Sequence, residues 1–380
     1  MRRWPRPLPA IVLSTLLALL ARPASPFQTA AAAQRQVDDN VASVARPEVD
    51  PLVVSPEMHA FIDAKVGRNQ TRQARLYDLQ HAIFDPEEGL GVTYGSAATY
   101  SAAGTFDQRS GNCLSFTLLF VALARHLDLD AYFVEVDEVT GWSQRGDVGL
   151  SHWHMYAEVE HDNAVTQVDF LPWIERRYLS ARRISDSRAR AHYHSNVGAD
   201  LVSAGRATEA LDHFERALEL DPTFEPARIN RAVAHHRSGQ TQLGVAALLG
   251  VLEREPGNTI AATNLASLYL ADGRQDEAER WLARREAALG RNPYYHFRLG
   301  MRALKDGDPA AARDHFKRAV SRQATEPVFF EKLAESQFRL GRIRKARSGL
   351  KRAIRLTEDE ERRQLLEARL ETYTRGPVGS

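Results

Sequence analysis

Residues 191–224 read AHYHSNVGADLVSAGRATEALDHFERALELDPTF, and the same pattern returns at a fixed interval of 34 residues. Each copy has a glycine, with a small residue seven positions before it and another five positions after it. The glycines are Gly205, Gly239, Gly273, Gly307 and Gly341. A glycine between two apolar segments turns the chain between antiparallel helices, and small residues let those helices approach. We therefore expect an all-α solenoid of five repeats over 191–358, closed by a capping helix and tail over 359–380.

The period and its residue pattern resemble the tetratricopeptide repeat (TPR). Large apolar residues follow each turn, as at Phe214 and Leu248, and prolines such as Pro222 stop the second helix of a repeat. The resemblance implies that the first helix of each repeat lines a concave face, where a protein or peptide binds. Asn196, Asn230 and Asn264 recur on that face at intervals of 34 residues and are candidate partner-binding residues. Asn is also common at this position in repeats that bind nothing there.

Two features of the solenoid sequence depart from a uniform repeat. Arg285 stands where repeats one, four and five have alanine. The third repeat is therefore expected to splay there, to direct Arg285 toward a partner, or to pack the arginine stem and expose its charge. A basic run extends from Arg339 to Arg355, and its simplest interpretation is a solvated helix face.

The N-terminus has the pattern of an export signal. Arg2, Arg3 and Arg6 precede an apolar run over residues 11–21, which is shorter than the ~20 residues that a membrane span needs. We predict a signal peptide over 1–33, a linker over 34–55, and a periplasmic or secreted mature protein without a membrane span. The alternative is an uncleaved N-terminal anchor.

The first half, residues 56–190, contains the single cysteine of the chain. Apolar residues after Gly111-Asn112-Cys113 recur at helical spacing, so Cys113 is expected in the first turn of a buried helix that Asn112 caps. The partial positive charge of that helix end stabilises a thiolate. Helices are also predicted over 58–65 and 73–84, and strands over 131–136, 153–159 and 165–170. A turn near residues 162–163 makes the last two strands a hairpin that brings Asp169 close to His154.

Three short motifs in this half resemble the transglutaminase-like domain of the papain-like superfamily of cysteine peptidases, amidases and acyltransferases. They are Gly-Asn-Cys113 at a helix start, His154-Met-Tyr-Ala-Glu-Val on a strand, and Val-Asp169-Phe on the next strand. The resemblance covers about residues 85–175. It implies an α+β papain-like fold and a catalytic triad of Cys113 as nucleophile, His154 as base and Asp169 orienting the imidazole. No cofactor is implied.

The main functional hypothesis is an exported cysteine hydrolase that acts through a thioester on Cys113, with a solenoid that binds a protein partner. One alternative is a non-catalytic TPR scaffold whose first domain is degenerate, and another is an acyltransferase that crosslinks proteins. A metal site is a further alternative, because His152, His154, His161, Asp162 and Asp169 include several possible zinc ligands. Residues 176–190 are expected to form a basic, helical connector.

Composition narrows the function classes. The chain has 380 residues, 50 of them basic and 49 acidic, and a net charge of +1. That balance argues against a dedicated nucleic-acid binder, whose affinity comes from excess positive charge. One cysteine excludes an intrachain disulfide, a multi-cysteine zinc site and an iron–sulfur cluster held by this chain alone.

Overall fold

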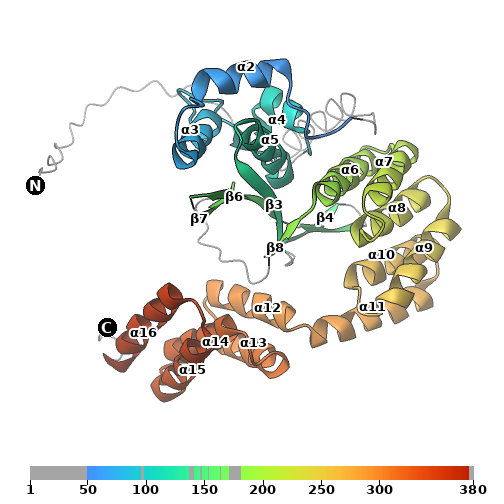
Figure 1. Cartoon of the computed structure of the whole chain (residues 1–380). Helices are drawn as coiled ribbons and strands as arrows, with labels where there is room; N and C mark the ends of the chain where they lie inside the picture. The colour runs from blue at the N-terminus through green and yellow to red at the C-terminus, as the bar shows by residue number, and fades with distance from the viewer. Residues whose placement is uncertain are drawn as a thin grey trace, which may run out of the picture.

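A computed structural model of the chain describes residues 49–95, 98–136, 141–145, 148–152, 154–162, 164–170 and 181–375 (Figure 1). The predicted signal peptide and most of the predicted linker lie outside these residues, as do the side chains of 141–152. An α+β part comes first and leads directly into a helical solenoid. None of the helices in the described residues is long and apolar enough to cross a bilayer.

The α+β part consists of helices on one face of a small antiparallel sheet (Figure 1). Its helices are α2 (Pro56–Lys65), α3 (Arg72–Phe84), α4 (Ala102–Gln108) and α5 (Cys113–His126). The sheet has the order β7-β6-β3-β8, from β7 (Ala164–Val168), β6 (Met155–His161), β3 (Asp130–Val136) and β8 (Ala181–Ile184). Two further ribbons pair β1 (Thr93–Tyr94) with β2 (Ser110–Gly111), and β4 (Gly141–Arg145) with β5 (Val148–His152). This confirms an α+β architecture, although it does not by itself show a papain-like fold.

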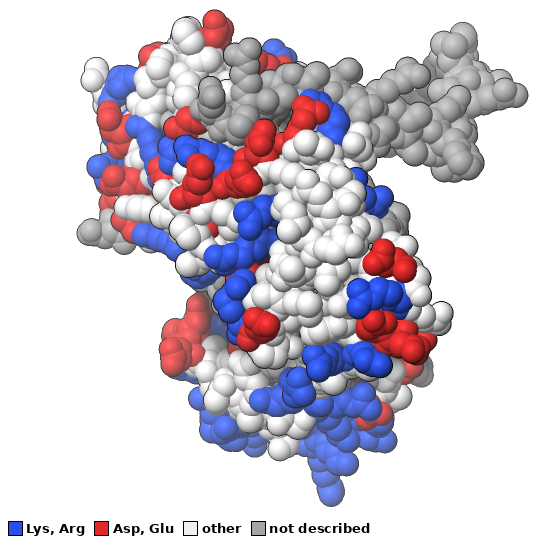
Figure 2. Space-filling view, turned by 90° about the vertical axis from the view of Figure 1, so that its right-hand side faces the viewer, with Lys and Arg blue, Asp and Glu red and all other residues white. Residues whose placement is uncertain are grey.

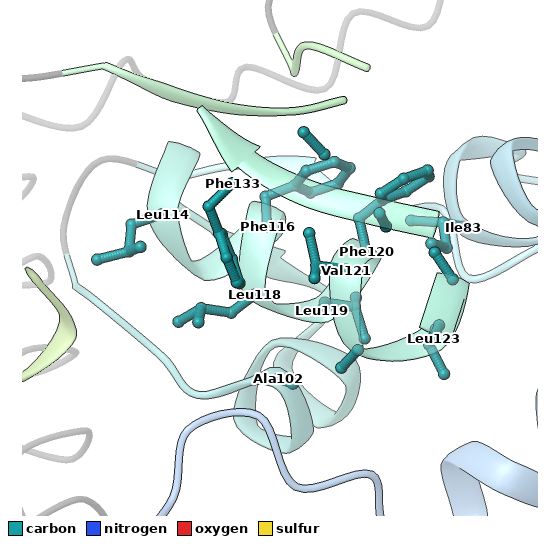
Figure 3. Close-up of a cluster of buried hydrophobic side chains, with 14 of the residues drawn as sticks. Ile83, Ala102, Leu114, Phe116, Leu118, Leu119, Phe120, Val121, Leu123 and Phe133 are labelled. Carbon is teal, nitrogen blue, oxygen red and sulfur yellow. The ribbon is translucent and has the colours of Figure 1, made fainter. Parts of the chain in front are cut away.

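Helix α5 is the centre of this part (Figure 3). It is apolar on all sides, and Leu118, Leu119, Phe120 and Val121 are fully buried. A helix without a polar face is stable only inside a core, where its neighbours cover every side. Phe133 of β3 lies in the same cluster and joins the helix to the sheet. The predicted buried helix behind Cys113 is therefore confirmed.

The other predicted elements of this half are confirmed within one or two residues where they are described, but two predictions at its edges are wrong. Residues 176–180 of the predicted helical connector lie outside the described residues; residues 181–184 form strand β8 instead, and only from Asp186 is the chain helical, in the first solenoid helix. The end of the predicted linker belongs to the folded part, because Asp50 pairs with Arg190 at 2.9 Å and the Pro51 carbonyl accepts from the Ala102 amide. These contacts join residues that are distant in sequence, so no local sequence pattern could predict them.

The solenoid has five helix pairs and a capping helix, as the repeat predicts. The pairs are α6 (Asp186–Ser203) with α7 (Ala207–Leu220), α8 (Glu225–Arg237) with α9 (Thr241–Arg254), α10 (Thr259–Ala271) with α11 (Gln275–Arg291), α12 (Pro293–Lys305) with α13 (Pro309–Arg322), and α14 (Pro327–Arg339) with α15 (Ile343–Leu356). The cap is α16 (Glu360–Arg375). All five turn glycines have φ between 70° and 84°, which only glycine adopts without strain.

The solenoid changes character after α11. In other repeats about four residues separate the second helix from the next repeat, whereas here α11 runs on to Arg291 and Asn292 alone precedes α12. The Asp-Pro and Glu-Pro stops of repeats one and two are replaced by Leu289-Gly290. Helices α11 and α12 are in much weaker contact than the corresponding helices of the other repeats. Repeat three is therefore splayed at its end, while Arg285 itself is 29% exposed and pairs with Glu286, as expected of a packed arginine stem with an exposed charge.

The first solenoid helix also completes the core of the α+β part. Its residues Ala189, Tyr193 and Val197 are buried in the same cluster as α5. A buried carboxylate, Glu135 of β3, accepts hydrogen bonds from Arg188 and His192 of α6. Burial raises the pKa of Glu135, but the hydrogen bonds and positive charges of these two partners lower it by more, so that the pKa falls to about 2. Because this ion cluster spans the junction, α6 is a shared element and no flexible linker lies between residues 184 and 186.

Candidate functional site

Cys113 is the first residue of α5, as the sequence predicts. Asn112 caps the helix, with its side-chain oxygen 3.0 Å from the Ser115 amide. Strand β2 delivers the chain to this point, and a Cβ on Gly111 would lie 2.7 Å from Cβ of Ser115. Glycine is therefore required immediately before the cap. Cys113 is half-buried, so its thiol combines a fixed position with access from solvent.

His154 and Asp169 come together across the β6–β7 hairpin. Nε2 of His154 lies 2.9 Å from both carboxylate oxygens of Asp169. The His154 side chain is buried, at 6% exposure, and Asp169 is 23% exposed. The backbone carbonyl of His154 accepts from the Val136 amide at 3.0 Å, which fixes the start of β6 against the end of β3. The expected juxtaposition of these two residues is present in the structure.

The His154 side chain also hydrogen-bonds to Cys113. Since the carboxylate occupies Nε2, the remaining ring nitrogen, Nδ1, is the one available to the thiol. Burial lowers the pKa of His154, but the hydrogen bonds and negative charges of Asp169 and Cys113 raise it more, to about 9. The imidazole is therefore protonated at neutral pH when the thiolate is present. The three residues thus lie in the order thiol, imidazole and carboxylate, which is the order that a nucleophile, an acid–base group and an orienting carboxylate would need.

Thr117 fixes the nucleophile helix to the histidine strand. Its hydroxyl is 2.7 Å from the Cys113 carbonyl and 3.3 Å from the Met155 carbonyl. One side chain therefore contacts the backbone at Cys113 and the backbone next to His154. This bridge limits relative sliding of α5 and β6, on which the thiol–imidazole distance depends.

A second hydrogen-bonded chain connects the site to the solenoid. Asp200 of α6 accepts from the Thr99 amide at 3.2 Å, and the Thr99 hydroxyl accepts from Nδ2 of Asn112 at 2.8 Å. The Tyr100 amide donates to the Ser115 hydroxyl at 2.8 Å, which orders the same loop. The cap beside Cys113 is thus held from the first repeat. Sequence analysis missed Thr99 and Asp200, because the 101 positions between them leave no local pattern.

Tyr94 lies at the edge of the site and was also missed. Strand pairing places it opposite Gly111, two residues before Cys113, and its ring centroid is 5.8 Å from that of Phe170, which follows Asp169. Burial and the nearby Cys113 charge raise the pKa of Tyr94, so its hydroxyl stays a hydrogen-bond donor. A lone tyrosine in a two-residue strand gave no signal in the sequence.

The residues proposed as alternative metal ligands do not gather. His161 bonds through Nε2 to Thr166 at 2.7 Å, whereas His154 is directed to Asp169 at the other end of β6. Across the described residues, no group of three or more His, Cys, Asp or Glu side chains is placed to hold a metal ion. The side chain of His152 lies outside the described part.

The three candidate partner-binding asparagines have different surroundings. Asn196 is half-buried on α6, and Nδ2 of Asn230 donates to the Ser195 hydroxyl at 3.2 Å, which joins α8 to α6. Asn264 is buried at 3% exposure, and its side-chain oxygen has no hydrogen-bond partner among the described residues. Strand β5 lies against α10, the helix that carries Asn264. The three amides are therefore not equivalent, and a hairpin of the α+β part approaches this part of the solenoid.

Comparison with known proteins identifies the repeats. A tetratricopeptide repeat family model matches residues 229–296 and 297–361, so the second half of this chain carries TPR repeats. The matched residues all lie in the solenoid. The resemblance of residues 85–175 to transglutaminase-like domains accordingly remains a prediction.

Solved structures of TPR proteins are also similar to part of this chain. A thermophilic TPR protein of Thermus thermophilus is 22% identical over 48% of this chain and 98% of its own, with a TM-score of 0.25. PilF of Pseudomonas aeruginosa is 18% identical over 50% and 87%, with a TM-score of 0.26. YrrB, a TPR protein with an unusual peptide-binding site, is 18% identical over 48% and 92%, with a TM-score of 0.24. Overlaps this loose define neither a partner nor an activity.

Proposed function

We propose that this protein is a cysteine hydrolase that cleaves an amide through a thioester on Cys113, and that its TPR solenoid holds a protein substrate or partner. One observation carries the proposal. The His154 side chain is hydrogen-bonded to Asp169 on one side and to Cys113 on the other. This order of groups activates a thiol, because the imidazolium stabilises the thiolate and the carboxylate fixes the ring.

The proposed reaction has two steps. The Cys113 thiolate attacks the amide carbonyl, and His154 gives its proton to the leaving amine as the C–N bond breaks. In the second step the neutral His154 ring removes a proton from water, and the resulting hydroxide attacks the thioester carbonyl. The C–S bond then breaks, the carboxylic acid is released, and Cys113 is left as a thiolate beside the protonated imidazole. If an amine attacks the thioester instead of water, the same intermediate leads to a crosslinking transamidation.

The oxyanion formed in each step needs two donors. The Cys113 backbone amide is one, because first-turn amides of a helix have no intrahelical acceptor. For the second we propose the Tyr94 hydroxyl, on the strength of its pairing opposite Gly111 and its proximity to the Cys113 charge. Tyr94→Phe is expected to lower turnover by ~10²-fold with little change in substrate binding.

Alkylation tests the proposal without a known substrate. Iodoacetamide should label Cys113 rapidly in the native protein at neutral pH, and His154→Gln should slow labelling to the rate of an ordinary thiol. Cys113→Ser is the control for labelling elsewhere. The hydrolase hypothesis fails if native Cys113 reacts only after denaturation. If native Cys113 does react rapidly, the Cys113→Ala variant is the next test. Polypeptides that copurify with this variant but not with wild type would be the candidate substrates.

The second candidate is a non-catalytic TPR scaffold, and the family match favours it because that match falls on the repeats. In this case the α+β half would serve as a docking platform on the first repeat. The alkylation result separates the two candidates, since a scaffold has no reason to hold its thiol as a reactive ion pair. A partner that binds equally to wild type and to Cys113→Ala, with slow alkylation, would establish the scaffold.

Export remains part of the proposal. Its support is the basic and apolar pattern of residues 1–33. Recovery of the protein from the cytoplasm alone would contradict export. N-terminal sequencing of the exported fraction tests cleavage, and an intact Met1 there would favour the uncleaved anchor.

A further inference from the structure

The balanced charge of the whole chain conceals a strongly basic end. Residues 309–356, from α13 to α15, contain thirteen Lys and Arg against four Asp and Glu, a net charge of +9. Because the whole chain is +1, all remaining residues together carry −8. Figure 2 shows this asymmetry as blue side chains gathered at one end of the molecule. The overall balance therefore cannot exclude a polyanionic partner for this end.

The cations belong to the outer helices of the last two repeats. Six exposed basic side chains, which we call the basic face, are Lys317 and Arg318 on α13 and Arg344, Lys345, Lys351 and Arg355 on α15. Arg322 and Arg352 are also exposed, but the first bonds to the Arg318 carbonyl and the second lies over the Phe330 ring. The apolar side of α15 is already used, since Ala346, Leu350 and Ala353 are fully buried in the solenoid. The basic side is therefore fixed toward solvent by packing.

The basic face has little internal counter-charge. Helix α15 contains no acidic residue, and the single acid of α13, Asp314, is paired with Arg313 at 2.7 Å, although its charge also acts on Lys317 and Arg318. Across the part of the chain that the structure describes, no carboxylate lies within ion-pair distance of the six side chains. Elsewhere in the solenoid arginines are commonly paired with a glutamate three positions away, as Arg274 is with Glu277. Like charges without a partner on one helix, as on α15, repel, so an external polyanion would relieve an existing cost.

We propose that the basic face binds the surface of a membrane rich in anionic phospholipid. The face is broad and its cations are spread over two helices, which suits a layer of phosphates better than one bound anion. No aromatic side chain is exposed between the cations, whereas proteins that bind single-stranded nucleic acid use such rings to stack bases. The predicted export of the chain also brings it to a membrane. Each cation near an anionic bilayer strengthens binding roughly five-fold, so a few suffice for peripheral attachment.

This inference does not depend on the proposed hydrolase, because it concerns a different face and needs no activity. If the protein attaches through α13 and α15, the α+β part lies on the opposite side of the molecule. The first three repeats, including the splayed third one, connect the two (Figure 1). The protein would then be positioned at the bilayer by its last two repeats.

Vesicle flotation of the whole chain tests the proposal. Anionic vesicles contain equal amounts of phosphatidylglycerol and phosphatidylcholine. Vesicles of pure phosphatidylcholine are the control, because binding to them measures any insertion of the N-terminal apolar run. The triple variant R344Q/K345Q/K351Q should bind the anionic vesicles ~100-fold more weakly. Binding by wild type should disappear near 1 M salt, where the Debye length is ~3 Å.

A matched variant controls for loss of charge as such. R280Q/R284Q/R291Q removes three cations from the exposed side of α11, and it should bind as wild type does. Thermal unfolding followed by circular dichroism verifies that both triple variants are folded. Equal binding to the two vesicle types, equal loss in both variants, or tighter binding to DNA than to anionic vesicles at the same salt would overturn the proposal.

Discussion

The solenoid and the α+β half differ in how far apart in the sequence their contacting residues lie. In the solenoid each helix packs against the next one or two, so that one 34-residue pattern specifies every interface. In the α+β half the site depends on Cys113, on His154 across the sheet and on a loop held by Asp200. Local repetition makes the solenoid predictable from sequence, whereas the candidate site in the α+β half depends on long-range contacts.

The largest effect is expected at the site. His154→Gln should reduce substrate turnover by about 10²–10⁴-fold, because proton transfer to the leaving amine and thiolate stabilisation are both lost. Alkylation of Cys113 at neutral pH should slow by only about ten- to thirty-fold, because an ordinary thiol is still a few per cent thiolate there. His161→Gln is the control, since His161 lies on the same strand but bonds to Thr166. Similar losses in both variants would show that β6 matters only for folding.

Asp169→Asn makes a related prediction about pH. The carboxylate raises the pKa of His154 toward about 9, so wild type keeps the protonated ring below that pH and loses it above. With a neutral amide the ionisation of the His154 ring, followed by NMR of its ring protons, should move down by about one to two pH units. An unchanged midpoint would show that Asp169 does not control His154.

Within the solenoid, exchange of Ala and Arg at matched positions tests whether repeat three is splayed. Ala319 is fully buried, and Ala319→Arg should cost about 3 kcal/mol or more in the free energy of unfolding. Arg285 is 29% exposed and pairs with Glu286, so Arg285→Ala should change stability by less than ~0.5 kcal/mol. Urea denaturation measures both, and equal costs would contradict a splayed repeat.

Buried histidine pairs give a third contrast. His194 and His213 face each other at 3.3 Å, and the same two repeat positions are His296 and His315 in repeat four. Burial lowers the pKa of His194 to about 3 and that of His213 to about 4. The unfolded chain therefore binds more protons below pH ~6.5, and stability falls as pH drops from there toward the folded-state values.

The expected loss for the first pair is about 2 kcal/mol per histidine at pH ~5, measured by urea denaturation against pH 7.5. His213→Gln should remove about half of this dependence. His315→Gln, at the equivalent place in repeat four, should remove less, because His315 is more exposed than His213. Equal effects of the two variants would refute the difference in burial.

The smallest effect concerns the chain from the solenoid to the cap. Asp200→Ala leaves the Thr99 amide without its acceptor, and we expect alkylation of Cys113 to slow by about tenfold or less. Asp212→Ala, an exposed acid on the next helix, serves as control. Thr99→Val should reproduce the defect and Thr99→Ser should restore it, because serine keeps the hydroxyl that Asn112 contacts. A normal alkylation rate in Thr99→Val would show that the contact between Thr99 and Asn112 does not transmit the effect of Asp200.

Sequence alone determined the five repeats, their turn glycines, the capping helix and the helix that begins at Cys113. The reason is that helical periodicity, helix caps and glycines with positive φ each depend on residues within a few positions of one another. Sequence also selected His154 and Asp169 as partners, because a hairpin turn fixes which residues of two strands oppose each other.

Only the tertiary structure decided that the imidazole reaches the thiol, that Asp200 steadies the cap, and that α6 belongs to both parts. It also replaced an expected helical connector by strand β8 and gathered dispersed cations into one face. These features join residues tens of positions apart or depend on which side of a helix is buried. Such information resides in packing, and no local pattern contains it.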